Sequence, residues 1–379
     1  MAPAPAIPLP QYAQTGRAPT APAAPSAPSV SVRPAPFRTP PGQRHPHVVL
    51  DLYRACNQTC VYCVSGSSPQ HDFGPFTDPE HRANLNRFFT LHGPFQILLT
   101  GGEPLLAPGL GPFLQELTAL GHRVAIQSNL KSRAGVQTVI DHLPPDDCPY
   151  ILTTFHSVEI RRWPRYLGHV QRLRDAGYRL AVKLVVDEPM LERFAEFFDE
   201  LVEREIGAVL APLMLFPPGE PPEAMEYSAD DWAQLAPRIT MNSAWLAFAG
   251  GFHSRGTACR AGSDLLFPQT HADGQIAGCC HGFPTALGNL TTGHLTPERH
   301  AVPCGLDRCT CDYHYYSGFI PTLDDAGRWE RLIRGDNTTV PFSDFLNWID
   351  AAGVRPVCDL RGKVAAEPAT LPAIYGAAG

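Results

Sequence analysis

The 379-residue sequence has no hydrophobic run approaching the ~20 residues that a transmembrane helix requires, so we expect no contact with a membrane. It also has no dense block of Lys and Arg, and its formal net charge is −7, so nucleic acid is not an expected partner. The N-terminus lacks the basic start and the apolar stretch of a secretory signal. Together these absences predict a soluble, cytoplasmic protein.

Cysteine, by contrast, is plentiful, with 11 residues in the chain. In a small secreted protein such a number would indicate a disulfide framework. In a long chain without a signal, the cysteines are more typical of metal ligands in a reducing cytoplasm. We therefore expect metal-binding thiolates rather than disulfide bonds.

The first 45 residues are rich in Pro, Ala, Ser and Thr. Such a segment cannot bury enough apolar surface to form a core, so we expect a disordered tail over residues 1–45. A docking arm for a partner is the alternative for this tail.

Three cysteines, Cys56, Cys60 and Cys63, stand close together in the spacing Cys-x3-Cys-x2-Cys. Thiolates bind iron–sulfur clusters or zinc, and closed sites take four ligands. Three close thiols without a nearby fourth predict a cluster that keeps one iron open. A zinc site that takes a distant fourth ligand is the alternative. The motif resembles the signature of radical S-adenosylmethionine (radical SAM) enzymes, in which the open iron binds the amino and carboxylate groups of SAM.

Two further segments strengthen this resemblance. An apolar, strand-like run over residues 96–100 leads directly into Gly101, Gly102 and Glu103. Glycines allow close backbone approach, and a carboxylate can accept hydrogen bonds from an ammonium group. This segment resembles the Gly-Gly-Glu segment by which the family holds the amino group of SAM. A second strand-like run ends in Ser128-Asn129, which resembles the family strand that contacts the ribose or carboxylate of SAM.

From residue 47 onward, apolar strands alternate with amphipathic helices, which predicts a parallel α/β sheet with right-handed crossovers. The expected strands are 48–53, 96–100, 123–127, 150–155, 180–186 and 208–216, and the expected helices are 79–91, 111–120, 134–143, 164–176 and 191–205. Six such units fit a partial (β/α)6 TIM-like barrel, which is also the core fold of the family. We expect the barrel over residues 46–230 and a small cysteine-rich α+β domain over residues 231–379.

In barrels of this type, ligands bind at the C-terminal ends of the strands. The cysteine loop, Gly101–Glu103 and Ser128-Asn129 all follow expected strands. His156 follows the fourth expected strand, and Lys183 lies in the fifth. Both are candidate contacts to SAM or substrate, although a strand end that turns polar on meeting water is the alternative. The family resemblance further implies that the backbone around Tyr62 flanks the adenine of SAM.

A second group of cysteines follows the expected barrel. Residues 267–280 read as a hairpin with an Asp273-Gly274 turn. The spacing around Cys259, Gly274 and Cys279 resembles the auxiliary-cluster region called SPASM, or Twitch in its shorter form. The resemblance implies one auxiliary [4Fe–4S] cluster, and the ligands we expect are Cys259, Cys279, Cys309 and Cys311, with Cys280 and Cys304 as substitutes. Two auxiliary clusters, or a structural zinc site, are the alternatives.

The resemblance implies reductive cleavage of SAM to a 5′-deoxyadenosyl radical that abstracts a substrate hydrogen, with Cys56, Cys60 and Cys63 around the reactive cluster. An auxiliary cluster suggests oxidation or dehydrogenation, or another modification, of a small-molecule natural product or a peptide. An electron donor such as flavodoxin or ferredoxin is an implied partner. The alternatives are a non-catalytic Fe–S or zinc-binding module and a radical SAM epimerase or methyltransferase.

Overall fold

The computed structural model describes most of the chain between residues 45 and 339. The described ranges are 45–60, 62–63, 66–215, 223–238, 240, 252–268, 274–280, 286–309 and 328–339, together with positions 344, 347, 350, 351 and 353.

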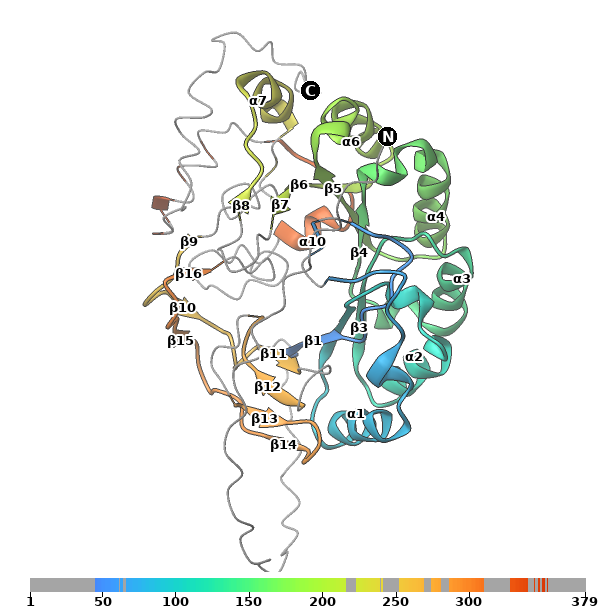
Figure 1. Cartoon of the computed structure of the whole chain (residues 1–379), viewed down its shortest axis with the longest axis vertical. Coiled ribbons are helices and arrows are strands. Elements are labelled where there is room, and N and C mark those ends of the chain that lie inside the picture. Colours follow the sequence, from blue (N-terminus) through green and yellow to red (C-terminus); the bar gives the residue numbers. More distant parts are fainter. Residues whose placement is uncertain are drawn as a thin grey trace, which may run out of the picture.

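Six parallel strands form the centre of the molecule, in the order in which they follow one another along the chain (Figure 1). They are β1 (His47–Asp51), β2 (Gln96–Thr100), β3 (Arg123–Ser128), β4 (Ile151–Phe155), β5 (Leu180–Val186) and β6 (Gly207–Pro212). Each strand pairs in parallel with the next one. β4, β5 and β6 are buried along their whole length, as expected for strands with helices on one side and an interior on the other.

Helices connect consecutive strands and cover one face of the sheet (Figure 1). They are α1 (Pro79–Leu91), α2 (Leu110–Ala119), α3 (Arg133–His142), α4 (Trp163–Asp175), α5 (Glu188–Leu191) and α6 (Phe194–Glu203). The start of α1 shows why these segments become helices, since the side chain of Asp78 accepts a hydrogen bond from the backbone N–H of His81 and Pro79 occupies the first turn. The arrangement is a partial α/β barrel, which confirms the predicted fold class.

Most of the expected elements are present. β2, β5 and α1 have the predicted bounds, and the other barrel strands and helices shift by a few residues at their ends. The helix predicted over residues 191–205 is present as α6, but it begins three residues later, at Phe194, because Leu191 ends the separate short helix α5. Asp187 caps α5 by accepting from the N–H of Met190, so this short helix starts earlier than the apolar pattern indicates.

The hairpin expected over residues 267–280 extends the barrel sheet. β11 (Leu265–Pro268) pairs in parallel with β1, on the side opposite β2. It continues into an antiparallel ribbon of β12 (Gln275–Ala277), β13 (Gly288–Asn289) and β14 (His294–Leu295). Gly274 has a φ of 78°, which supports the predicted turn before β12. Asp273 lies outside the described residues.

Shorter elements complete the described chain. They are β7 (Met214–Leu215), β8 (Glu223–Ala224), β9 (Phe252–His253), β10 (Ala258–Cys259), β15 (Val302–Pro303), β16 (Arg308–Cys309), α7 (Ala229–Leu235), α10 (Arg328–Leu332) and the 3-10 turns η1 (Gly74–Thr77), η2 (Pro104–Leu106), η3 (Pro145–Asp147), η4 (Ser157–Arg162) and η5 (Ala236–Arg238). β7 pairs with β8, β9 with β16 and β10 with β15, each as a two-stranded antiparallel ribbon.

The segment 328–339 packs against the end of the barrel where the strands begin. The side-chain oxygen of Asn337 accepts from the N–H of Ala208 at 2.7 Å, and its Nδ2 donates to the carbonyl of Ile206 at 2.8 Å. Trp329 packs edge-on against Tyr150, with ring centroids 5.1 Å apart. These contacts join residues from the C-terminal part of the chain to β4 and β6.

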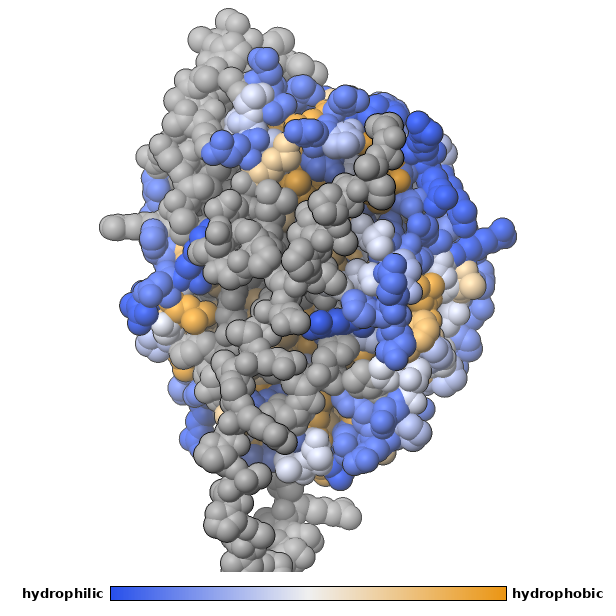
Figure 2. Space-filling view, viewed as in Figure 1, coloured by the Kyte–Doolittle hydropathy of each residue, from blue (hydrophilic) through white to orange (hydrophobic). Residues whose placement is uncertain are grey.

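The barrel helices present mostly hydrophilic side chains on the face shown in Figure 2. Among the described residues, no helix has both the length and the apolar character needed to cross a membrane.

Candidate functional site

The C-terminal ends of the first four strands carry most of the residues that the sequence singled out for SAM binding. The cysteine loop follows β1, Gly101–Glu103 follows β2, and Ser128 ends β3. His156 follows β4 directly, whereas Lys183 lies within β5 and is buried. Because parallel strands place these ends at one edge of the sheet, the groups come within reach of one another.

The two glycines allow the stem of the cysteine loop to lie directly on the end of β2. Gly102 donates its N–H to the carbonyl of Tyr53 at 2.6 Å, and Glu103 donates its N–H to the carbonyl of Ala55 at 2.9 Å. A Cβ at Gly102 would lie 2.0 Å from the carbonyl oxygen of Ala55. Gly101 has a φ of 111°, and its Cβ would lie 2.2 Å from Oδ1 of Asp51. The sequence predicted that the two glycines allow a ligand to approach the backbone closely. In the structure, the segment from Tyr53 to Ala55 makes this close approach.

The carboxylate of Glu103 is buried beside the end of β3. Its Oε1 accepts from the hydroxyl of Ser128 at 2.7 Å and from the N–H of Leu105 at 3.0 Å, and its Oε2 accepts from the N–H of Asn129 at 2.8 Å. Burial raises the pKa of Glu103, and the three hydrogen bonds oppose that shift. A carboxylate has about four acceptor positions, so these donors leave one at Oε2.

Residues just after β3 hold the first half of the cysteine loop. The side-chain amide of Asn129 donates to Oδ1 of Asn57 at 2.9 Å and lies 3.8 Å from the sulfur of Cys56. Lys131 donates to the carbonyl of Asn57 at 3.1 Å and forms an ion pair of 2.7 Å with Glu159. We did not predict Lys131, although it stands two residues after Asn129 in the same strand-end segment.

His156 holds the second half of the loop. Its Nδ1 lies 3.0 Å from the hydroxyl of Tyr62 and 3.6 Å from the sulfur of Cys60. The rings of His156 and Tyr62 stack, with centroids 5.8 Å apart. Burial, together with the nearby charge of Lys183, lowers the pKa of His156 to about 4, so the imidazole is neutral at pH 7.

The thiols of the loop are partly buried, and the charges of neighbouring thiolates raise the pKa of Cys56 and of Cys60. Burial raises the pKa of Cys56 to about 11 and of Cys60 to about 12, and the neighbouring thiols add to both shifts. Thiols in such surroundings stay protonated unless a cation binds them, which suits a site completed by a metal. Within the described part of the chain, no three Cys, His, Asp or Glu side chains already converge on one point. The three thiols of one short loop are nevertheless the donor type that an iron–sulfur cluster requires.

The cysteines after the barrel lie on separate short elements. Cys259 ends β10, Cys309 ends β16, and Cys279 follows β12, and all three are buried. Cys304 is half-buried and Cys280 is exposed. Cys311, the fourth expected ligand, lies outside the described residues.

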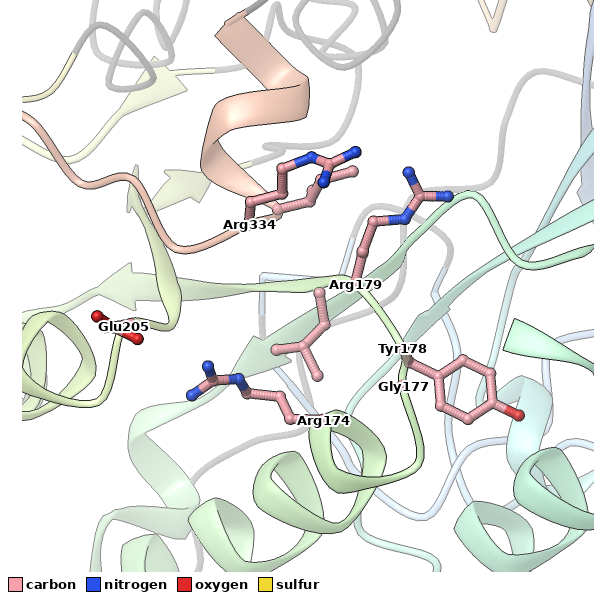
Figure 3. A pocket seen from close by; sticks show the side chains of 8 residues that line it. Arg174, Gly177, Tyr178, Arg179, Glu205 and Arg334 are labelled. Carbon is pink, nitrogen blue, oxygen red and sulfur yellow. The ribbon is translucent and has the colours of Figure 1, made fainter. Parts of the chain in front are cut away.

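Two cavities lie away from this cluster. One, of about 240 Å³, is at the opposite end of the barrel, where Arg174, Arg179 and Arg334 surround the start of β5 (Figure 3). Glu330 lies 3.5 Å from Arg179 and 4.0 Å from Arg334, so these two guanidinium groups already have a counter-ion. The other, of about 410 Å³, lies beyond the end of β5, between α5 and α7.

The comparisons with known proteins add to this geometry. No family model matches the chain. An AdoMet-dependent heme synthase from Methanosarcina barkeri is 23% identical over 199 residues, which is 50% of this chain and 56% of that protein. A GTP 3′,8-cyclase from Actinobacillus succinogenes is 26% identical over 182 residues, 44% of this chain and 52% of that protein. The chain thus spans about half the length of these two curated relatives.

Together with the Cys-x3-Cys-x2-Cys loop, these two relatives support a radical SAM superfamily protein. Among solved structures, native anSMEcpe with bound AdoMet is similar, with 13% identity, a TM-score of 0.46, and coverage of 81% of this chain and 98% of that one. The matched relatives support the superfamily, and the roles of individual residues in this radical SAM protein follow as proposals.

Proposed function

We propose that this chain is a radical SAM enzyme whose Cys56, Cys60 and Cys63 hold a [4Fe–4S] cluster that binds S-adenosylmethionine. When bound, the cluster and SAM supply reductive cleavage of the sulfonium to a 5′-deoxyadenosyl radical, which abstracts a hydrogen atom from the substrate. The observation that carries the proposal is the placement of the three-cysteine loop across the ends of β2, β3 and β4, beside the buried carboxylate of Glu103.

Glu103 and the groups around it bind the amino-acid part of SAM in this proposal. The remaining acceptor position at Oε2 of Glu103 receives the ammonium group, because a buried carboxylate favours a cationic donor. Ser128 and Asn129 orient that carboxylate through their hydrogen bonds. Gly101 and Gly102 act indirectly, by allowing the cysteine loop to pack on the end of β2.

At the next strands, His156 follows β4 and Lys183 lies within β5. Tyr62 and the backbone beside it flank the adenine, and the side chain of Tyr62 is fixed by its contact with His156. Lys183 is buried in β5, close enough to His156 to help lower its pKa, and in this proposal it contacts SAM or the substrate. A closed, dry cavity at this edge would protect the radical from side reactions.

An auxiliary [4Fe–4S] cluster in a Twitch-like region completes the proposal. Its ligands are Cys259, Cys279, Cys309 and Cys311, within a domain over residues 231–379 that follows a barrel over residues 46–230. The three described members of this set are buried, which suits thiolates that must exclude water. β11 pairs with β1, so the region is joined to the strand that leads into the cysteine loop. The pairing involves His47 and Val48 at the start of β1, so it attaches the region to the barrel sheet. An auxiliary cluster in this region would accept an electron from the substrate radical, which would make the reaction a net oxidation or dehydrogenation.

The substrate in this proposal is a small-molecule natural product or a peptide, and the reducing electron comes from a donor such as flavodoxin or ferredoxin. The class of substrate can be tested once the protein has been shown to cleave SAM.

The deciding experiment measures 5′-deoxyadenosine. The protein is purified without oxygen, reconstituted with iron and sulfide, and incubated with SAM and dithionite, alongside a Cys56/Cys60/Cys63→Ala variant. Cys148→Ala is the matched control, because Cys148 is a fully buried thiol whose sulfur lies 3.5 Å from the carbonyl of Tyr150, away from the loop.

We expect product from the native chain and the control, and none from the triple variant. If the native protein takes up a full complement of iron in the loop and still makes no 5′-deoxyadenosine with any donor or candidate substrate, the non-catalytic binding module becomes the better reading. If zinc rather than iron fills the loop after anaerobic purification, the proposal is wrong.

A further inference from the structure

His156 makes contacts that SAM binding alone does not require. One ring nitrogen, Nδ1, is close both to the sulfur of Cys60, at 3.6 Å, and to the hydroxyl of Tyr62, at 3.0 Å. Cys60 is the middle cysteine of the loop, and Tyr62 lies between it and Cys63. A single imidazole after β4 therefore contacts the loop at two places.

A neutral imidazole carries one N–H, on either Nδ1 or Nε2. Among the described residues, Nδ1 has the polar partners and Nε2 has none. A thiolate that binds iron is an acceptor, and a proton on Nδ1 would point toward it.

The contact with Tyr62 is compatible with a proton on Nδ1. The tyrosine oxygen lies 3.0 Å from Nδ1, and a hydroxyl oxygen can accept a hydrogen bond. The Nδ1–H can therefore be shared between this oxygen and the sulfur of Cys60, which is 3.6 Å away.

We propose that His156 is a positioning residue that donates an Nδ1–H hydrogen bond to the cluster-bound sulfur of Cys60 and raises the reduction potential of that cluster. The inference rests on the proposed function, because it requires a cluster in the loop. Reduction by one electron from the external donor adds negative charge to the cluster, and a donor aimed at a ligand sulfur stabilises the more negative state.

The test is a potentiometric titration followed by electron paramagnetic resonance, on the full-length chain with its iron content measured. The signal that the Cys56/Cys60/Cys63→Ala variant loses is assigned to the loop cluster, which separates it from any auxiliary cluster. The variants are His156→Ala, His156→Asn and His156→Gln. Asn places an amide N–H near the position of Nδ1, whereas Gln places one nearer Nε2. The matched control is His294→Asn, an exposed histidine in β14.

We expect His156→Ala and His156→Gln to lower the ratio of reduced to oxidised cluster about tenfold at a fixed solution potential, which is a shift of 59 mV for one electron. His156→Asn should retain most of the native potential, and His294→Asn all of it. A native midpoint in an iron-loaded His156→Ala protein would overturn the inference. So would an equal loss in His156→Asn and His156→Gln, since the donor would then not be at Nδ1.

Two outcomes separate this inference from the proposed function. If the native chain gives no signal that depends on Cys56, Cys60 and Cys63, the proposed cluster is absent and both ideas fail. If the signal and 5′-deoxyadenosine formation are present but the midpoints of all variants coincide, the proposed function stands and the role of His156 is refuted. Should His156→Ala fail to load iron, the comparison of Asn with Gln decides the matter.

Discussion

Ser128 donates a hydrogen bond of 2.7 Å to Oε1 of Glu103, and this bond joins the C-terminal ends of β2 and β3. The backbone of Glu103 joins a third segment, because its N–H donates to Ala55 and its carbonyl accepts from the hydroxyl of Tyr53 at 2.6 Å. One residue therefore links the stem of the cysteine loop to two strands. Its carboxylate stabilises the fold by accepting hydrogen bonds, and it is also the proposed binding group for the ammonium of SAM.

Replacing Glu103 with Gln should weaken both roles. The amide keeps the shape but offers one acceptor oxygen, so at least one of the N–H donors of Leu105 and Asn129 or the hydroxyl of Ser128 loses its partner. We expect the free energy of unfolding to fall by about 1–3 kcal/mol. SAM should bind at least about tenfold more weakly, because the bond to a charged acceptor is lost. Chemical denaturation and calorimetric titration with SAM measure the two effects.

Ser128→Ala is the matched control for that variant. It removes one donor and leaves the charge, so we expect a loss of about 0.5–1.5 kcal/mol of stability and a smaller change in SAM affinity. Equal SAM affinity in Glu103→Gln and the native chain would show that the carboxylate does not hold the ammonium group.

The buried carboxylate of Glu103 also predicts a pH dependence of stability. Burial raises the pKa of Glu103 in the folded chain above its ordinary value of 4.5, so the folded state holds this proton more tightly than the unfolded state. The resulting contribution to stability is complete below the unfolded pKa and is lost as the pH rises through the folded pKa.

The measurement is the stability of the native chain minus that of Glu103→Gln, from denaturant titrations in the absence of SAM. This difference should decrease as the pH rises from about 4.5, since Gln does not titrate. A difference that grows with pH would mean that the three hydrogen bonds outweigh burial and that the folded pKa is depressed.

The space at Gly102 gives a steric prediction. A Cβ there would lie 2.0 Å from the carbonyl oxygen of Ala55, and both atoms belong to backbone segments that cannot swing aside. Gly102→Ala should therefore displace the stem of the cysteine loop and cost about 1–3 kcal/mol or more of stability. We also expect a large loss of iron from the loop after reconstitution.

The helix α4 supplies the matched control, because an added Cβ at Gly168 would meet nothing within 4 Å. Gly168→Ala should leave iron binding unchanged and stabilise the chain by about 0.5–1 kcal/mol, as expected for Ala in a helix. Native iron content in Gly102→Ala would contradict the role of the glycine pair in holding the loop.

Local signals in the sequence were enough to predict the barrel but not its closest contacts. β2 and β5 were predicted residue for residue, because short apolar runs between turn residues have clear ends. The break between α5 and α6 was missed, because Leu191 and Phe194 keep helical spacing across it. The pairing of β11 with β1 joins residues more than two hundred positions apart, and no local pattern encodes it. The contact of His156 with Cys60 is equally long-range, so a polar residue after β4 could be suspected but its partner could not.

The last prediction concerns Lys131, which contacts the cysteine loop from outside the motif. It donates to the carbonyl of Asn57 at 3.1 Å and pairs with Glu159 at 2.7 Å, and both charged side chains are less than a third exposed. Lys131→Met should lower stability by about 1 kcal/mol, with a smaller loss at high salt. It should also increase the rate at which a chelator removes iron from the loop several-fold, because the loop loses one of its anchors.

Arg162→Met separates the two contributions of Lys131. Arg162 pairs with the same carboxylate of Glu159 at 2.9 Å, and it has no contact with the cysteine loop among the bonds of the described residues. If the ion pair with Glu159 alone protects the cluster, both variants should lose iron at similar rates. If the bond from Lys131 to Asn57 protects it, as we expect, only Lys131→Met should lose iron faster than the native chain.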